Sequence, residues 1–290
     1  YTVEGENWDQ EPVEAMAIDE NGKIIFLGST DDVQDYIGNQ TNVIDLEGKT
    51  VLPGFIDSHV HAPGTALTEL FEINLHAYFT KDDTMAAVAE FIEANPDLDV
   101  YFGTGFSMGM VDENGDPPNA SWIDEICPDK PVTLQSNDLH NYLLNSKAMK
   151  LCGINKDTVT ESEGNIHRYP DGTPTGLFTD VTDIEFPTAE YNSDQQKEAL
   201  ELFVETMNAW GYTSIMSISP LFGIEYDIYS DLEAEDKLTL RVNISQYMEP
   251  ENPGRSLEDL IIMKDTMESD LIKVSTAKYM LDGVVEGYTA

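Results

Sequence analysis

Two histidines one residue apart, His59 and His61, are the clearest candidates for chemistry in this sequence. They close the stretch 51–61, in which a Pro-Gly turn signal precedes a short apolar run and Asp57. Side chains in an extended strand repeat every two residues, so these three would share one face, with the histidines about 6.6 Å apart along the chain. Neutral imidazoles on one face can hold a metal ion such as zinc, iron, nickel or manganese. A bare pair with this spacing is more often an exposed or core pair, so its surroundings must decide.

Several motifs, in order along nearly the whole chain, resemble the metal-dependent amidohydrolase superfamily. PGFIDSHVHA at 53–62 resembles its first barrel strand, and AMAIDENGKIIFLG at 15–28 resembles the N-terminal strands that precede the barrel. Four later segments resemble the amidohydrolase family 3 branch, which contains N-substituted formamide deformylase: 131–149, 164–178, 211–215 and 277–290. The resemblance implies a hydrolase for carbon–nitrogen bonds other than peptide bonds, with His59 and His61 as metal ligands.

Lys278 is the third candidate ligand. It lies in an apolar stretch, and a buried lysine is costly unless its charge is removed or paired. In the resembling family, a lysine at the end of the fourth barrel strand is carbamylated by CO₂ and bridges two metals. The resemblance thus implies one or two divalent ions, zinc first and iron or manganese as alternatives, held by His59, His61 and carbamylated Lys278. The alternative is an ion pair of Lys278 with Asp282 or another carboxylate.

The polar cluster 136–140 follows an apolar run and precedes an expected helix over 142–151. Polar residues at a strand end before a helix are common site residues in α/β proteins. His140 is therefore the candidate residue to hold the substrate or the oxyanion. The alternative is local hydrogen bonding, with Asp138 capping the helix. Asn145 is expected to brace that helix and not to touch substrate.

The resemblance also implies residues that this sequence does not contain. These are histidines on the fifth and sixth barrel strands and an aspartate on the eighth, which binds metal and moves a proton. We therefore expect the catalytic aspartate and the rest of the barrel beyond Ala290. The rival interpretation is a non-catalytic remnant that binds a small ligand or partner. Within the superfamily, hydantoinase, cyclic imidase and N-acyl amino acid deacylase activities are alternatives.

The elements that must position these residues alternate between helix and strand after residue 193. Helices are predicted at 194–210, 224–235 and 256–267, and strands at 212–218, 238–244, 272–274 and 276–282. This alternation predicts an α/β protein with a parallel sheet. The resemblance implies a (β/α)8 TIM-like barrel, of which this chain holds the first half.

Two further regions flank or interrupt the predicted barrel. Residues 1–50 are expected to form part of a small N-terminal β-sandwich domain. The barrel part, 51–290, is expected to hold an inserted subdomain at about 100–190, after the first barrel strand. The elements expected here are a hairpin around Asn21-Gly22, a short helix at 30–37, a strand at Val43–Ile44, a helix at 80–94 capped by Thr80 and a hairpin around Asp171-Gly172.

The charge balance limits the partners. Asp and Glu number 55 against 15 Lys and Arg, which gives a net charge of −40. Such a field repels nucleic acid and anionic membranes, so we expect neither as a partner. It indicates either adaptation to high salt or an acidic proteome. The expected partner is a small-molecule amide-type substrate, and a homodimer is compatible with the sequence.

The cellular compartment is predicted from features that this sequence lacks. Cys127 and Cys152 are too few for a disulfide framework, so free thiols in a reducing cytosol are expected. No apolar run reaches the ~20 residues of a membrane span, and no signal peptide is recognised. We therefore expect a cytoplasmic protein.

Overall fold

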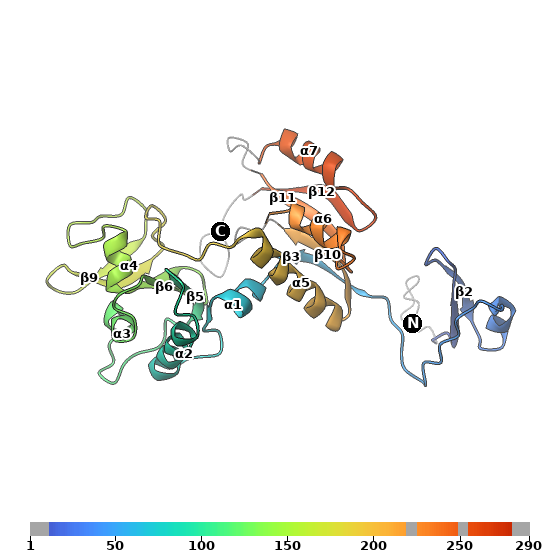
Figure 1. Ribbon diagram of the computed structural model, residues 1–290, viewed down its shortest axis with the longest axis horizontal. Helices are drawn as coiled ribbons and strands as arrows, with labels where there is room; N and C mark the ends of the chain where they lie inside the picture. Colours follow the sequence, from blue (N-terminus) through green and yellow to red (C-terminus); the bar gives the residue numbers. More distant parts are fainter. Residues whose placement is uncertain (1–11, 219–224, 249–254, 280–290) are drawn as a thin grey trace.

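The computed structural model describes residues 12–218, 225–248 and 255–279, and they form an α/β structure. The strands in these ranges form three sheets, of two, four and six strands. Figure 1 shows the three sheets as separate groups along the long axis, with the four-stranded sheet in the middle. No helix in the described ranges is long and apolar enough to cross a membrane.

The two-stranded sheet is the predicted hairpin. Strands β1 (Ala15–Ile18) and β2 (Ile24–Gly28) are antiparallel, and the Asp19 carboxylate accepts two backbone N–H bonds in the turn between them. The 3₁₀ helix η1 (Asp32–Tyr36) stands where a short helix is expected. The predicted strand at Val43–Ile44 is wrong. These residues are 62% and 72% exposed and no described strand pairs with them, so their apolar character finds no sheet.

The four-stranded sheet is entirely parallel. Its order is β12 (Ile272–Lys278), β11 (Arg241–Tyr247), β10 (Tyr212–Ile218) and β3 (Phe55–Val60). Strands β10, β11 and β12 each follow a helix: α5 (Ser193–Ala209), α6 (Asp227–Ala234) and α7 (Leu257–Met267). Apolar strand residues such as Ile215, Val242 and Val274 share one core with α5 and α6 residues such as Leu200 and Leu232. The predicted strand–helix alternation is therefore confirmed.

Two details of this sheet differ from the prediction. The strand expected at 238–244 lies at Arg241–Tyr247, because the buried Leu238 belongs to the loop that closes α6. Leu238 and Lys237 both donate their backbone N–H to Leu232 O. Helix α5 spans Ser193–Ala209, one residue before the predicted 194–210 at each end, because Asn192 caps it in a capping box with Gln195.

The six-stranded sheet lies between β3 and α5 in the chain. Helix α1 (Ala66–Phe71) leads into it, and its order is β4 (Ile73–Asn74), β5 (Tyr101–Phe106), β6 (Val132–Ser136), β7 (Asn141–Leu144), β9 (Pro174–Thr179) and β8 (Asn165–Arg168). Strands β4, β5 and β6 are parallel, and the remaining pairs are antiparallel. Its helices are α2 (Lys81–Ala94), α3 (Ala120–Asp124) and α4 (Ser146–Leu151).

This sheet begins at residue 73, earlier than the insertion expected at about 100–190; the division into domains stays a prediction. Thr80 caps α2 as predicted, since its side chain accepts from Asp83 N. The helix predicted over 142–151 is wrong in its first part. Residues 141–144 form β7, which pairs with both β6 and β9, and only α4 is helical. The apolar Tyr-Leu-Leu run fits a central strand as well as a helix.

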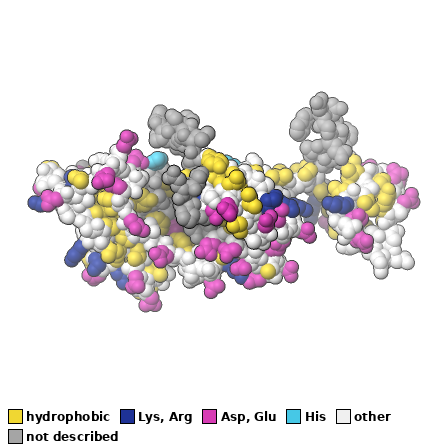
Figure 2. Space-filling model, turned by 90° about the horizontal axis from the view of Figure 1, so that it is seen from above, with side chains coloured by type: hydrophobic (Ala, Val, Ile, Leu, Met, Phe, Trp, Pro, Cys, Tyr) yellow, Lys and Arg dark blue, Asp and Glu magenta, His cyan; other side chains and the backbone are white. Residues whose placement is uncertain are grey.

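The surface carries the acidic excess of the sequence. Figure 2 shows Asp and Glu side chains spread over the visible face, whereas Lys and Arg appear in fewer places. Five ion pairs are found among the described residues, and one joins a histidine to an aspartate. Within the described ranges, most acidic side chains therefore belong to none of these ion pairs.

Candidate functional site

The His59–His61 pair lies at the carboxyl end of β3. The two ring centroids are 5.4 Å apart at an angle of 67°, so the two imidazoles stand side by side as the spacing predicts. His59 is exposed and His61 is half-buried. The Asp57 carboxylate accepts a bond from the backbone N–H of His59, at 2.9 Å, which fixes the backbone that presents the first ring.

Both histidines lie on the face of the sheet opposite to the helices. The pairing of β3 with β10 shifts register between Asp57 and Val60, so the facing is counted from Val60, which packs against the core that α5 and α6 build. Its two chain neighbours, His59 and His61, whose rings lie 5.4 Å apart, therefore point to the other face. In a full set of parallel strands, this other face is the inner one. The chain runs from the carboxyl end of β3 through α1 directly into the six-stranded sheet (Figure 1). This sheet is called the inserted sheet below, because it separates β3 from β10 in the sequence.

Lys278 lies on the same face as the histidines, at the carboxyl end of β12. It pairs in register with Tyr247, and Tyr247 lies on the same face of β11 as Asn243, four residues earlier. Asn243 bonds Ser275 and Thr276 on the face away from the core residue Val242. Lys278 is half-buried and has no ion pair among the described residues; Asp282, its suggested partner, lies outside them.

The imidazole pair fits a metal ion. Two imidazoles bound to one zinc at about 2.0–2.1 Å have ring centroids roughly 5 Å apart, close to the 5.4 Å observed. The described residues hold no group of three His, Cys, Asp or Glu side chains that could bind a metal. No third side chain of these four types therefore lies beside the pair in the part of the chain that the structure describes.

His140 makes different contacts and does not touch the histidine pair. Its Nδ1 lies 2.6 Å from Asp180 Oδ1, and its backbone N–H donates to Asp138 Oδ1 at 3.1 Å. Asp138 does not cap a helix as suggested; it closes the 136–141 turn with Ser136 and Asn141. Burial tends to raise the pKa of Asp138, but the bonds from Ser136, His140 N–H and Asn141 hold that pKa below its ordinary value.

Sequence reasoning missed two features of this region. Asp180 lies 40 residues from His140, and no local pattern pairs them. Glu72 is buried after α1 and accepts from Thr68 and Tyr191. Burial raises the pKa of Glu72 despite these bonds. Nothing in the sequence around Glu72 signalled this burial, since charged residues are normally exposed.

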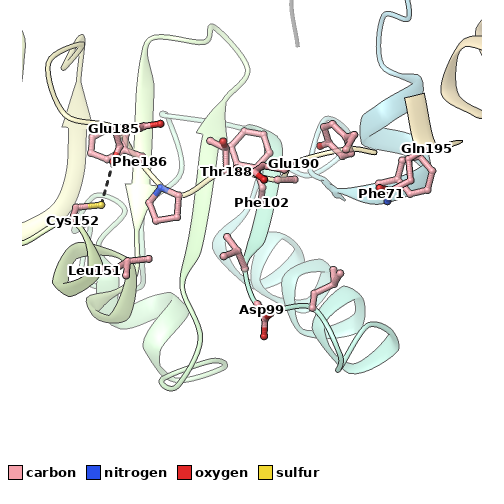
Figure 3. Close-up of a pocket in the computed structure, with 15 residues that line it drawn as sticks. Phe71, Asp99, Phe102, Leu151, Cys152, Glu185, Phe186, Thr188, Glu190 and Gln195 are labelled. Carbon is pink, nitrogen blue, oxygen red and sulfur yellow. Dashed lines mark hydrogen bonds between the residues drawn. The ribbon is translucent and has the colours of Figure 1, made fainter. Parts of the chain in front are cut away.

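A cavity of about 700 Å³ lies between α1, the start of α5 and the inserted sheet (Figure 3). Aromatic side chains such as Phe71, Phe102 and Phe186 line it together with the carboxylates of Glu185 and Glu190. None of the predicted site residues lines this cavity. It is therefore separate from the metal site that the sequence predicts.

Comparison with known proteins shows the family to which this chain belongs. Residues 42–290 match the amidohydrolase family, so this chain belongs to that family. It belongs to the branch that includes N-substituted formamide deformylase: the enzyme of that name from Arthrobacter pascens is 27% identical over 191 residues, which cover 64% of this chain and 35% of the enzyme.

The chain is also similar to Protein LONG AFTER FAR-RED 3 of Arabidopsis thaliana, with 31% identity over 282 residues, 93% of this chain and 47% of that protein. The matched part of the chain spans 47% of the length of this plant protein and 35% of the length of the deformylase. A metal-dependent hydrolase of uncharacterised function from Pyrococcus horikoshii has a similar fold, with a TM-score of 0.62 and 18% identity over 92% of this chain and 50% of that one.

Proposed function

We propose that the protein is a metal-dependent hydrolase that cleaves a carbon–nitrogen bond of a non-peptide amide. The observation that carries this proposal is the shared face: two adjacent imidazoles at the end of β3 and a lysine at the end of β12, all opposite to the helices. Carboxyl ends of parallel strands are where active sites of such α/β proteins lie. Membership of the amidohydrolase family supports the reaction class.

The proposed architecture is a (β/α)8 barrel, with β3, β10, β11 and β12 as its first four strands. Four parallel strands in chain order with a helix before each later strand support it. In a flat sheet β3 and β12 would lie about 14 Å apart, three strand spacings, too far for one or two bridged metals to reach both. The curvature of a closed barrel brings such ends around a common axis.

In this proposal His59, His61 and Lys278 hold one or two divalent metals, zinc first, with iron or manganese as alternatives. The lysine would bind as the carbamate formed with CO₂. A divalent metal lowers the pKa of a coordinated water and polarises a carbonyl. Asp57 keeps the backbone of His59 in place, and His140 is proposed to contact the substrate. An aspartate is proposed as the group that passes the proton to the leaving nitrogen.

The proposed substrate is a small amide, and the name of the relative from Arthrobacter pascens supports an N-substituted formamide. Nucleic acid is not proposed as a partner because the net charge of −40 would repel it.

The test is metal content per chain, measured by plasma mass spectrometry on the full-length protein purified without chelator. We expect one to two ions, loss of most of this metal in His59→Ala and normal loading in His76→Ala, an exposed histidine outside the pair. Lys278→Ala should lose metal and activity. Acetate, added in a bicarbonate-free buffer, should partly restore its activity. No bound metal after incubation with zinc and bicarbonate would contradict the proposal and favour a non-catalytic protein that binds a small ligand.

A further inference from the structure

Ser245 on β11 has a buried hydroxyl without a hydrogen-bond partner. The residue is 1% exposed, and its Oγ bonds no atom in the part of the chain that the structure describes. Buried hydroxyls are normally hydrogen-bonded, because an unpaired one costs free energy. The hydroxyls of Thr84 and Thr133 are also unpaired, but they lie in α2 and β6 of the inserted region, whereas Ser245 lies in the sheet of the proposed metal ligands.

Ser245 lies on the same face of this sheet as Lys278. The preceding residue, Ile244, belongs to the core on the helix side, so Ser245 points to the opposite face. Ser245 pairs in register with Thr276, and Lys278 follows two residues later on β12. The pairing shifts register just before Ser245, but Thr276 is fixed to this face because its Oγ1 accepts from Asn243.

The side chain of Lys278 can reach this hydroxyl. Neighbouring strands lie about 4.8 Å apart, and a parallel strand advances about 3.3 Å per residue, so the two Cα atoms are about 8 Å apart along the diagonal. Long side chains span such a diagonal between adjacent strands. The nitrogen at the end of the lysine, or a group attached to it, can therefore lie against Ser245 Oγ.

The side neighbours of Ser245 do not use its hydroxyl. Ile218, its register partner on β10, has no polar side-chain atom. On β12, Thr276 Oγ1 lies 3.4 Å from Asn243 Nδ2, and Ser275 donates to Asn243 Oδ1 at 2.7 Å. These three polar side chains thus bond one another. The free proton of Ser245 needs an acceptor, and a lysine ammonium has none, whereas a carbamate has only acceptors.

We propose that the Ser245 hydroxyl donates a hydrogen bond to the carbamate of Lys278, which makes Ser245 a positioning residue for this ligand. This inference rests on the proposed function, in which CO₂ modifies the lysine. The neutral Nζ attacks the carbon of CO₂ and forms the N–C bond, one C–O π pair moves to its oxygen, and one proton leaves Nζ for solvent. The product is an anion, and a donor beside it fixes its orientation and favours its formation in a molecule of charge −40.

The first measurement is the carbamate itself, by ¹³C NMR of full-length, zinc-loaded protein titrated with ¹³C-bicarbonate at pH 8. We expect a carbamate signal in the parent protein that Lys278→Ala lacks. The bicarbonate concentration for half of the maximal signal should rise about tenfold in Ser245→Ala, since one charge-assisted hydrogen bond is lost. Ser217→Ala is the matched control, because its hydroxyl is equally buried but accepts from Tyr229 on the helix side, and it should leave this concentration unchanged.

The second measurement, the thermal midpoint, separates this role from a purely structural one. Without zinc and bicarbonate, Ser245→Ala should not lower the midpoint, because it removes a buried hydroxyl that bonds nothing. With zinc and bicarbonate, the midpoint of the parent should rise by more than that of Ser245→Ala. An equal decrease in the variant under both conditions would overturn the proposal.

Failure of this inference and failure of the proposed function give different results. A carbamate signal that depends on bicarbonate identically in the parent and in Ser245→Ala would overturn the role of Ser245 and leave the carbamate in place. A parent protein that binds zinc but shows no carbamate signal would overturn the roles of both Ser245 and Lys278. A parent protein that binds no zinc would contradict the proposed function itself.

Discussion

At the scale of residues, the candidate site consists of side chains whose neighbours define their chemistry. His59 and His61 stand 5.4 Å apart because strand alternation sends both to one face, and this much could be predicted from their spacing. The partner of His140 could not, because Asp180 reaches it only through the pairing of β7 with β9. Local patterns identify ligands on one strand, whereas partners on different strands depend on the register between them.

Glu72 gives a prediction at the same scale. Burial raises its pKa above 4.5, while the bonds from Tyr191 and Thr68 oppose the shift. The native state therefore binds this proton more tightly than the unfolded chain. Its stabilising contribution is complete below pH 4.5 and declines as pH rises through the raised pKa. We expect Glu72→Gln to gain stability relative to the parent between pH 4 and pH 7, by about 1.4 kcal/mol for each unit of pKa shift.

Urea unfolding at the two pH values measures this difference. Glu69→Gln is the matched control, since Glu69 is exposed on the same helix α1. The difference in unfolding free energy between Glu69→Gln and the parent should be the same at both pH values. If the difference in unfolding free energy between Glu72→Gln and the parent were also the same at both pH values, the buried carboxyl of Glu72 would have the same pKa in the folded and unfolded states.

At the scale of elements, strand and helix types were predictable where the apolar period was clear. The alternation from α5 to β12 follows the sequence, and Thr80 caps α2 as expected. Residues 141–144 were misassigned, because three apolar residues cannot distinguish a strand from a helical turn. What decides is the partner: β7 lies between β6 and β9, and the sheet supplies hydrogen bonds on both sides.

Asn145 ties several elements of the inserted sheet together. It is fully buried, its Oδ1 accepts from Val132 N and Ala148 N, and its Nδ2 donates to Cys127 O and Lys130 O. This confirms its expected structural role at the start of α4. Asn145→Ala would leave these backbone groups buried without partners, so we expect a loss of about 2–4 kcal/mol.

The midpoint of urea unfolding measures this loss. Asn119→Ala is the comparison, because Asn119 caps α3 and its bonds to Ser121 and Pro117 are all exposed to solvent, so that its loss should cost only about 1 kcal/mol. Equal losses in the two variants would contradict a bridging role for Asn145.

At the scale of the whole molecule, charge is the dominant property. With a net charge of −40, repulsion between side chains opposes the folded state, and salt screens it. We expect KCl raised from 0.05 to 0.5 M to increase the thermal midpoint by about 2–5 °C, the equivalent of roughly 1 kcal/mol in a chain of this size. Differential scanning calorimetry measures it, with equal osmolality of sorbitol as the control. A midpoint that does not respond to KCl would show that the charges are already compensated.

The open borders of the four-stranded sheet give this charge a second role. Within the described residues, β3 and β12 each hydrogen-bond to one neighbour only, so each has a border of unpaired N–H and C=O groups. In the proposed barrel these borders pair with further strands of the same polypeptide, and before they pair an extended segment of another molecule can join them, which is how sheet proteins begin to aggregate. Mutual repulsion between molecules of charge −40 keeps these borders apart in dilute salt. Salt that strengthens a single molecule therefore also removes its protection against self-association.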